Sequence, residues 1–296
     1  MRRGLMLAVW MAAAPLTSGA APGDEVLVIR TSDLAPYRTV ESSFQKASGR
    51  TLRQVSLSEP GGAERAAREL GRPAALVLAI GPEACRLVAG HKPSAPTLYT
   101  MVPNPAVLGP AAAAMVLPMF ADPQAQLKTV HQLLPRAQTL GVVFDPQQSS
   151  AIVEAYGRAA SEAGFKLVRA QVASRGEVAS AVRGMVGRVD ALWLVPDATV
   201  ISVDTVKFLV ETSLSNRLPL IGFSQGIAKA GALVAFEAEY SQLGEAAARA
   251  ARRVIATSAA ETQELPAGVV YLNGRAAELL GISLPDAVRG QARRVF

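Results

Sequence analysis

The 296-residue chain has few of the residues that perform chemistry in most enzymes: one cysteine, two histidines and 5% aromatic residues. The lone Cys85 cannot form an intramolecular disulfide, and with two distant histidines it gives no zinc-type ligand spacing. Neither a G-x-x-x-x-G-K-[ST] nor a G-x-G-x-x-G sequence occurs, so the phosphate cradles of nucleotide-binding proteins are missing. Carboxylates are sparse, and no acid–base pair stands out. We therefore expect neither a metal nor a cofactor.

One short motif does look catalytic. Gly222–Gly226 reads Gly-Phe-Ser-Gln-Gly and fits G-x-S-x-G, the turn that presents the nucleophilic serine of many hydrolases. Such a serine needs a histidine base, which in these hydrolases follows it in the chain. Both histidines, His91 and His131, precede Ser224 and fall at a helix end and on a helix face. We interpret Gly222–Gly226 as a turn after a strand, and we predict that the protein is not an enzyme.

The first 20 residues have the pattern of a secretory signal peptide. Arg2 and Arg3 supply the positive region, Gly4–Ala14 supplies the apolar region, and small residues allow a cut after Ala20 or Ala21. The apolar run is too short to span a bilayer, which makes a retained anchor the weaker alternative. No cysteine lies near the cut to carry a lipid anchor. The sequence predicts a soluble mature protein in the periplasm.

The charge of the chain argues against a nucleic-acid partner. Removing the two signal arginines lowers the net charge from +6 to about +4. The remaining arginines are scattered over predicted helices without interleaved aromatic residues, whereas a nucleic-acid groove needs a denser basic stripe.

Short strands and helices alternate along the mature chain. Apolar runs such as Ala74–Ile80 (AALVLAI) and Thr139–Phe144 (TLGVVF) are typical of strands buried on both faces of a parallel sheet. One series of strand–helix units covers about 25–118 and a second about 119–230. The predicted fold class is α/β, with two doubly wound parallel-sheet lobes and a cleft between them.

The tail decides how the lobes are joined. It reads as a strand at Ala232–Phe236, a helix at Tyr240–Ala256 and a strand at Gly268–Leu272. If the chain leaves the first lobe near residue 118, the tail can return there and cross back, which makes three hinge crossovers that permit closure over a ligand. The predicted N-terminal lobe is 21–118 plus about 237–262, and the predicted C-terminal lobe is 119–236 plus about 263–296.

Ten residues that follow predicted strands, or begin the next helix, are candidate ligand contacts. Asp197 could face a ligand cation, and the helix start after Asp145 favours an anion. Helix capping and turn chemistry explain such residues equally well. Glu237 and Tyr240 flank the second crossover, where a hinge role competes with ligand contact. The ten candidates are Ser32, Glu83, Asn104, Asp145, Ser149, Ser150, Asp197, Thr199, Phe223 and Ser224.

Several segments together resemble a known family. Asp190–Thr199 (DALWLVPDAT), Leu218–Ser224 (LPLIGFS) and Ala230–Val234 (AGALV) look like the substrate-binding proteins of ABC transporters of the tryptophan/tyrosine type, the TrpX-like group. Leu140–Pro146 and Leu272–Ala277 add to a likeness that covers nearly the whole mature chain. The resemblance implies a type I periplasmic binding fold, an amino-acid or related ligand held between strand carboxyl ends, and an ABC permease as partner.

The chain also departs from that family's pattern. Gly81 is followed by Pro82, where members commonly carry a threonine whose hydroxyl can hold a carboxylate. Val102–Pro105 (VPNP) stands where members commonly have an Asp-Pro pair. We expect a changed pocket in a monomeric solute-binding protein of an importer. A secreted sensor partner with the same fold is the alternative, which a neighbouring sensor-kinase gene in place of permease and ATPase genes would favour.

Overall fold

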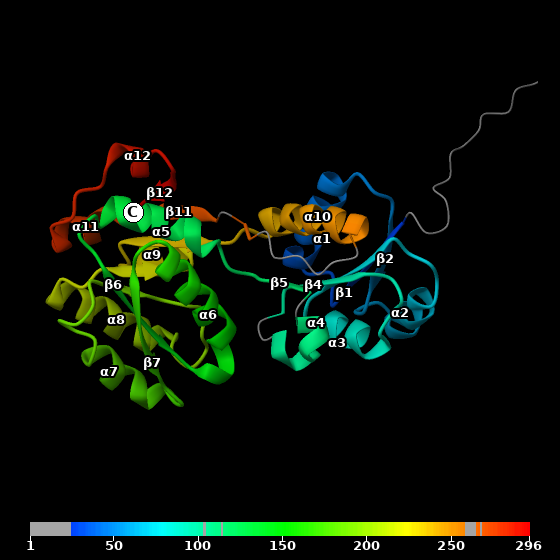
Figure 1. Cartoon of the computed structure of the whole chain (residues 1–296), viewed down its shortest axis with the longest axis horizontal. Coiled ribbons are helices and arrows are strands. Elements are labelled where there is room, and N and C mark those ends of the chain that lie inside the picture. Colours follow the sequence, from blue (N-terminus) through cyan, green and yellow to red (C-terminus); the bar gives the residue numbers. More distant parts are fainter. Residues whose placement is uncertain (1–24, 103–104, 114, 258–264, 267) are drawn as a thin grey trace, which may run out of the picture.

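Two separate β-sheets form the centres of two lobes, which lie side by side along the long axis of the molecule (Figure 1). The computed structural model describes residues 25–102, 105–113, 115–257, 265–266 and 268–296. The predicted signal peptide and Asn104 lie outside these ranges. Within the described part of the chain, no helix combines the length and the hydrophobicity that a membrane crossing needs.

The N-lobe is built on a parallel sheet whose central strands are apolar along most of their length, because helices cover both faces. Helices α1 (Ala35–Ser48) and α10 (Tyr240–Thr257) pack on one face, and α2 (Gly62–Leu70) and α3 (Pro82–His91) pack on the other. In sheet order the strands are β2 (Leu52–Ser56), β1 (Val26–Arg30), β3 (Leu76–Ile80), β4 (Thr97–Thr100) and β5 (Val116–Leu117), with the short helices η1 (Pro105–Leu108) and α4 (Pro110–Ala113) between β4 and β5 in the chain.

The C-lobe sheet has seven strands in the order β12 (Ala292–Val295), β11 (Val269–Leu272), β10 (Val234–Glu237), β9 (Leu220–Gly222), β8 (Ala191–Trp193), β6 (Thr139–Phe144) and β7 (Lys166–Gln171). One face is covered by α5 (Pro123–Leu133), α6 (Pro146–Glu162), α11 (Gly274–Leu280) and α12 (Asp286–Arg289). The other face is covered by α7 (Arg175–Arg183), α8 (Val203–Asn216) and the short α9 (Gln225–Ala230).

The chain passes between the lobes three times. It leaves the N-lobe between β5 and α5, returns between β10 and α10, and crosses again between α10 and β11. Helix α10 therefore packs against α1 in the N-lobe, although the strands before and after it belong to the C-lobe sheet (Figure 1). The two helices approach so closely that a Cβ on Gly244 would lie 2.4 Å from the carbonyl oxygen of Val40.

The structure confirms the α/β class with two parallel-sheet lobes and three crossovers, and corrects it in detail. β10 and β11 pair antiparallel, because α10 carries the chain to the other lobe and back between them. Helix α9 begins at Gln225, inside the stretch predicted as a turn, and was not predicted because its six residues are too few to show a helical period. The edge strand β12 was not predicted, because its ARRV sequence is mostly exposed and lacks an apolar run.

Candidate ligand-binding site

A cavity of about 590 Å³ lies where the two lobes and the crossing segments meet. Val102, Pro105 and Val116 line it from the N-lobe, and the C-lobe supplies residues that follow β8, β9 and β10 or lie on α6. Ligand sites in open α/β sheets lie at the carboxyl ends of strands, and this cavity has that position. Its size is within the range of small-molecule sites.

Aromatic rings form much of the cavity wall, although the whole chain is poor in them. The lining rings are Phe120, Tyr156, Phe223, Phe236 and Tyr240. Ser150, Ser224, Gln147, Gln148 and Glu237 are polar lining residues. An apolar wall with a few polar groups is the usual composition of a site for a small organic ligand.

Tyr156 is held in the cavity wall by buried neighbours. Its ring stacks on Trp193 with 3.8 Å between ring centroids, and the ring of Phe120 meets it edge-on at 6.0 Å. Gln126 holds the pair: its Oε1 accepts from Trp193 Nε1 at 2.9 Å, and its Nε2 donates to the Tyr156 hydroxyl at 3.4 Å. Burial raises the pKa of Tyr156 to about 12, so its hydroxyl stays protonated at neutral pH.

Four of the predicted site residues form a network behind the wall. Asp197 Oδ2 accepts from the Asp145 N–H at 2.8 Å and from Ser149 Oγ at 2.5 Å, and Oδ1 accepts from the Thr199 N–H at 2.9 Å. Thr199 Oγ1 donates to Asp145 Oδ2 at 2.7 Å. None of the four lines the cavity. Their observed role is to shape the chain there, and ligand contact by them stays a prediction.

This network sets the first turn of α6. Asp145 is the N-cap, and its Oδ1 accepts from the Gln147 N–H at 2.9 Å. Ser149 departs from helical geometry, with φ −137° and ψ 18°, while its hydroxyl is bound to Asp197. Gln147, Gln148 and Ser150, on either side of this kink, line the cavity.

Ser150, Phe223 and Ser224 line the cavity as residues on its C-lobe side. Ser224 is the N-cap of α9, where its Oγ accepts from the Ile227 N–H at 3.4 Å. Strand, turn and helix follow one another here as in a hydrolase elbow, but no histidine is among the described lining residues. His91 Nδ1 lies 2.9 Å from the Leu87 carbonyl oxygen, and the ring of His131 packs against Phe165.

The N-lobe candidates lie at strand ends outside the cavity wall. Ser32 follows β1, and its Oγ accepts from the Leu34 N–H at 3.5 Å. Glu83 is exposed at the start of α3 and pairs with Arg86 at 3.3 Å. Burial, together with the nearby charge of Glu83, raises the pKa of Tyr37.

The segment around Pro82 has its own support. Gly81 has φ 93°, and a Cβ there would lie 2.6 Å from Thr31 Oγ1. Thr31 Oγ1 accepts from the Ala84 N–H at 3.1 Å. The start of α3 is thus capped from the neighbouring β1–α1 connection.

Sequence reasoning missed Phe120, Gln147, Gln148 and Tyr156. A signal for Tyr156 exists, because Ile152 and Tyr156 are four residues apart on one helix face and both line the cavity. Phe120 lies in the first crossing, whose path cannot be read from a local pattern.

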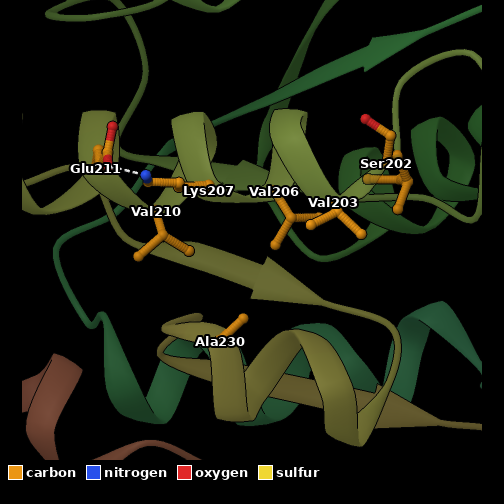
Figure 2. A pocket seen from close by; sticks show the side chains of 8 residues that line it. Ser202, Val203, Val206, Lys207, Val210, Glu211 and Ala230 are labelled. Carbon is orange, nitrogen blue, oxygen red and sulfur yellow. Dashed lines mark ion pairs between the residues drawn. The ribbon is translucent and has the colours of Figure 1, made fainter.

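A second cavity, of about 660 Å³, lies on the outside of the C-lobe between α8 and α9. Figure 2 shows Val203, Val206, Val210 and Ala230 lining it, with Lys207 and Glu211 forming an ion pair at 3.9 Å. One lobe alone forms it, and its wall is almost entirely apolar. The cavity between the lobes is therefore the candidate site. In the described residues, no group of three or more His, Cys, Asp or Glu side chains could hold a metal ion.

Known proteins match this chain in sequence and in fold. The family profile "ABC transporter substrate binding protein" matches residues 121–296. A tyrosine-binding protein from Clostridioides difficile (strain R20291) is 25% identical over 131 residues, which are 44% of this chain and 37% of that protein. The match thus spans well under half of that relative's length.

Two solved structures share the fold. An ABC domain in complex with L-Trp from Streptococcus pneumonia has a TM-score of 0.54 at 19% identity and covers 93% of this chain and 100% of that one. The ligand-free, open structure of a substrate-binding protein with adhesive properties from Clostridium difficile has a TM-score of 0.64 at 19% identity, covering 92% and 99%.

Proposed function

The chain belongs to the family of ABC transporter substrate-binding proteins, and from this premise we propose that it is the periplasmic receptor of an importer. In this proposal the signal peptide of residues 1–20 directs export, and the mature protein delivers a small polar ligand, an amino acid or a related compound, to a permease in the inner membrane. The N-terminal lobe comprises 21–118 and about 237–262, and the C-terminal lobe comprises 119–236 and about 263–296.

The observation that carries the proposal is the cavity of about 590 Å³ at the junction of two lobes that the chain crosses three times. A ligand in this place contacts both lobes and the crossing segments at once. It therefore binds a closed arrangement better than an open one, and this difference in affinity drives closure.

The lining also indicates the kind of ligand. Five aromatic rings surround the cavity, and burying one ring-sized apolar group contributes about 1.5–3 kcal/mol. The polar groups orient the ligand rather than supply most of the affinity. The relatives named above, one described as tyrosine-binding and one bound to L-Trp, support a ligand with an aromatic body.

Calorimetry and small-angle scattering together test the proposal. The mature protein is titrated with amino acids, their decarboxylated and deaminated derivatives, nucleosides and small carboxylates. We expect saturable binding of at least one compound, coupled to a decrease in the radius of gyration. No binding and no compaction across the panel would contradict a solute-binding role.

A matched pair of variants locates the site. Phe223→Ala removes a ring that lines the cavity, and we expect it to weaken binding about ten-fold. Phe208→Ala removes a ring from α8, away from the cavity between the lobes, and should leave binding unchanged. Equal losses in both variants would show that the cavity is not where the ligand binds.

A further inference from the structure

We infer that the ligand carries a cationic amine on a flat apolar body and has no carboxylate, and that Glu237 is the residue that recognises the amine. The inference rests on the proposed function, since it names the class of solute that the cavity between the lobes would hold. Three observations support it. The cavity wall has no basic residue, protein acceptors bind N–H groups at the helix N-termini beside the cavity, and aromatic rings lie beside Glu237.

The segments that form the cavity wall carry no basic residue. The sequence has no lysine or arginine in 93–127, 137–157, 189–206, 218–228 or 230–248, and these ranges contain every described lining residue. They do contain acids at the cavity or directly behind it, namely Asp145, Asp197, Glu237 and Glu239. Arg293 reaches the hinge from β12, but its two terminal nitrogens donate to the two oxygens of Glu239. A ligand carboxylate would meet no positively charged side chain from this wall.

Protein acceptors already take N–H groups at both helix N-termini beside the cavity. Such a terminus binds an anion through free N–H groups. In α6, Pro146 has no N–H, the Gln147 N–H donates to Asp145 Oδ1 at 2.9 Å, and the Gln148 and Ser149 N–H groups donate to the Asp145 carbonyl at 2.9 and 3.0 Å. In α9, the Gln225 N–H donates to Glu237 Oε2 at 3.0 Å. Protein carboxylates thus take the place that a ligand carboxylate would need.

On the facing edge of the N-lobe, the arginine that ends β1 is already paired with acids. Arg30 ends β1, but its Nε and Nη2 donate to Asp33 Oδ1 at 2.9 and 2.7 Å, and its Nη1 donates to Glu41 Oε2 at 2.7 Å. Pro82 removes an N–H at the start of α3, and Glu83 follows it. Arg30 is therefore not free to pair with a ligand carboxylate.

Glu237 is placed to receive an ammonium group. It ends β10 at the second crossing and is half-buried, and one of its oxygens is held by the Gln225 N–H. Among the described residues, no hydrogen bond is made by its other oxygen, Oε1. Phe236 and Tyr240 also line the cavity beside it, and aromatic faces attract cations. A carboxylate beside rings suits an amine, whereas a ligand carboxylate there would meet no positive charge from the wall.

Compounds that share one ring system separate the charge classes. Tryptamine, L-tryptophan and indole-3-propionate carry the same indole with an amine, an amine plus a carboxylate, and a carboxylate alone. Tyramine, L-tyrosine and 3-(4-hydroxyphenyl)propionate repeat the series on a phenol. We expect the amines to bind with compaction at least about ten-fold more tightly than the amino acids, and the carboxylates not to saturate in the same range.

Two glutamine variants assign the charge. Glu237→Gln keeps an oxygen for the Gln225 N–H but loses the charge, and it should weaken amine binding about ten-fold while changing carboxylate binding little. Glu211→Gln, in the outer cavity of Figure 2, should change neither.

The outcomes distinguish this inference from the proposed function. Compaction with an amino acid or a carboxylate at equal or tighter affinity than the amine would overturn the inference and leave the proposed function standing. Amine binding that is unchanged in Glu237→Gln would overturn the role of that residue. No binding and no compaction with any of the six compounds would overturn the inference, and the wider panel then decides the proposed function.

Discussion

The rings of Tyr156 and Trp193 stack 3.8 Å apart at an angle of 22°, which places a fully buried tryptophan of β8 directly behind a tyrosine of the cavity wall. Trp193 is in turn held by Gln126 of α5. The shape of the wall therefore depends on contacts between three elements, and this dependence can be measured.

Trp193→Phe should destabilise the protein and loosen the wall. The variant keeps an aromatic ring but leaves Gln126 Oε1 without the Trp193 Nε1 donor in a buried place, which costs about 1–3 kcal/mol of the free energy of unfolding. Urea unfolding measures the loss. Leu279→Ala, at a half-exposed position of α11, should stay within about 0.5 kcal/mol, and an equal effect in both variants would contradict the buried hydrogen bond.

Asp197→Asn should lower the free energy of unfolding, although asparagine and aspartate have nearly the same shape. Both oxygens of Asp197 accept hydrogen bonds, from Asp145, Ser149, Thr199 and Val200, and an asparagine can satisfy these donors with one oxygen only. We expect a loss of about 2–3 kcal/mol in urea unfolding.

The exposed Asp204→Asn in α8 is the matched control. If Asp197 served only as a ligand contact, its variant would unfold like wild type and lose binding alone.

Two glycine substitutions should act in opposite directions. Gly244→Ala places a Cβ 2.4 Å from the Val40 carbonyl oxygen between α10 and α1, and forcing the helices apart costs about 1–3 kcal/mol. In Gly90→Ala, in α3, the added Cβ meets nothing within 4 Å. The substitution should raise the free energy of unfolding by about 0.4–1 kcal/mol, because alanine lowers the conformational entropy of the unfolded chain. Thermal unfolding of both variants checks this. A neutral Gly244→Ala would mean that α1 and α10 do not pack at this distance.

Glu41 should make stability depend on pH. Burial raises the pKa of its carboxyl above the ordinary 4.5, and Arg30 opposes that effect. The folded protein thus favours protonated Glu41. The stability that protonated Glu41 adds to the folded protein is fully present below about pH 4.5, and it is lost as the pH rises through the folded-state pKa.

Glu41→Gln mimics the protonated form at every pH. Wild type should therefore lose unfolding free energy relative to this variant as the pH rises from the ordinary 4.5 through the raised folded-state pKa, measured by urea unfolding. A difference that stays constant, or that shifts in favour of wild type with rising pH, would contradict the raised pKa. Glu64→Gln, an exposed change on α2, is the control.

The elements that the sequence predicts best are those whose burial is complete. β1, β3 and β6 read as continuous apolar runs because helices cover both sides of them. β12 was not predicted because this edge strand is held by its pairing with β11, and its own residues are mostly exposed and polar.

The candidate site could be predicted only in part. Asp145 and Asp197 follow strands as ligand contacts do, but capping needs the same residue types at the same places, and the sequence cannot separate the two. Ser150, Phe223 and Ser224 line the cavity, and their contact with a ligand stays a prediction. Phe120 and Tyr156 meet only because a crossing segment and a helix converge in space.

The return of α10 to the N-lobe has a consequence for biosynthesis. The strands of that lobe are complete by residue 117, but α10, which covers one face of their sheet, ends at residue 257. At ordinary rates of translation the ribosome needs on the order of ten seconds to make the intervening segment. During that time Val26, Val28 and their neighbours have only α1 as cover, so the lobe that is begun first is completed only after most of the other lobe has been made. A gene cut between the lobes would leave the first half without α10.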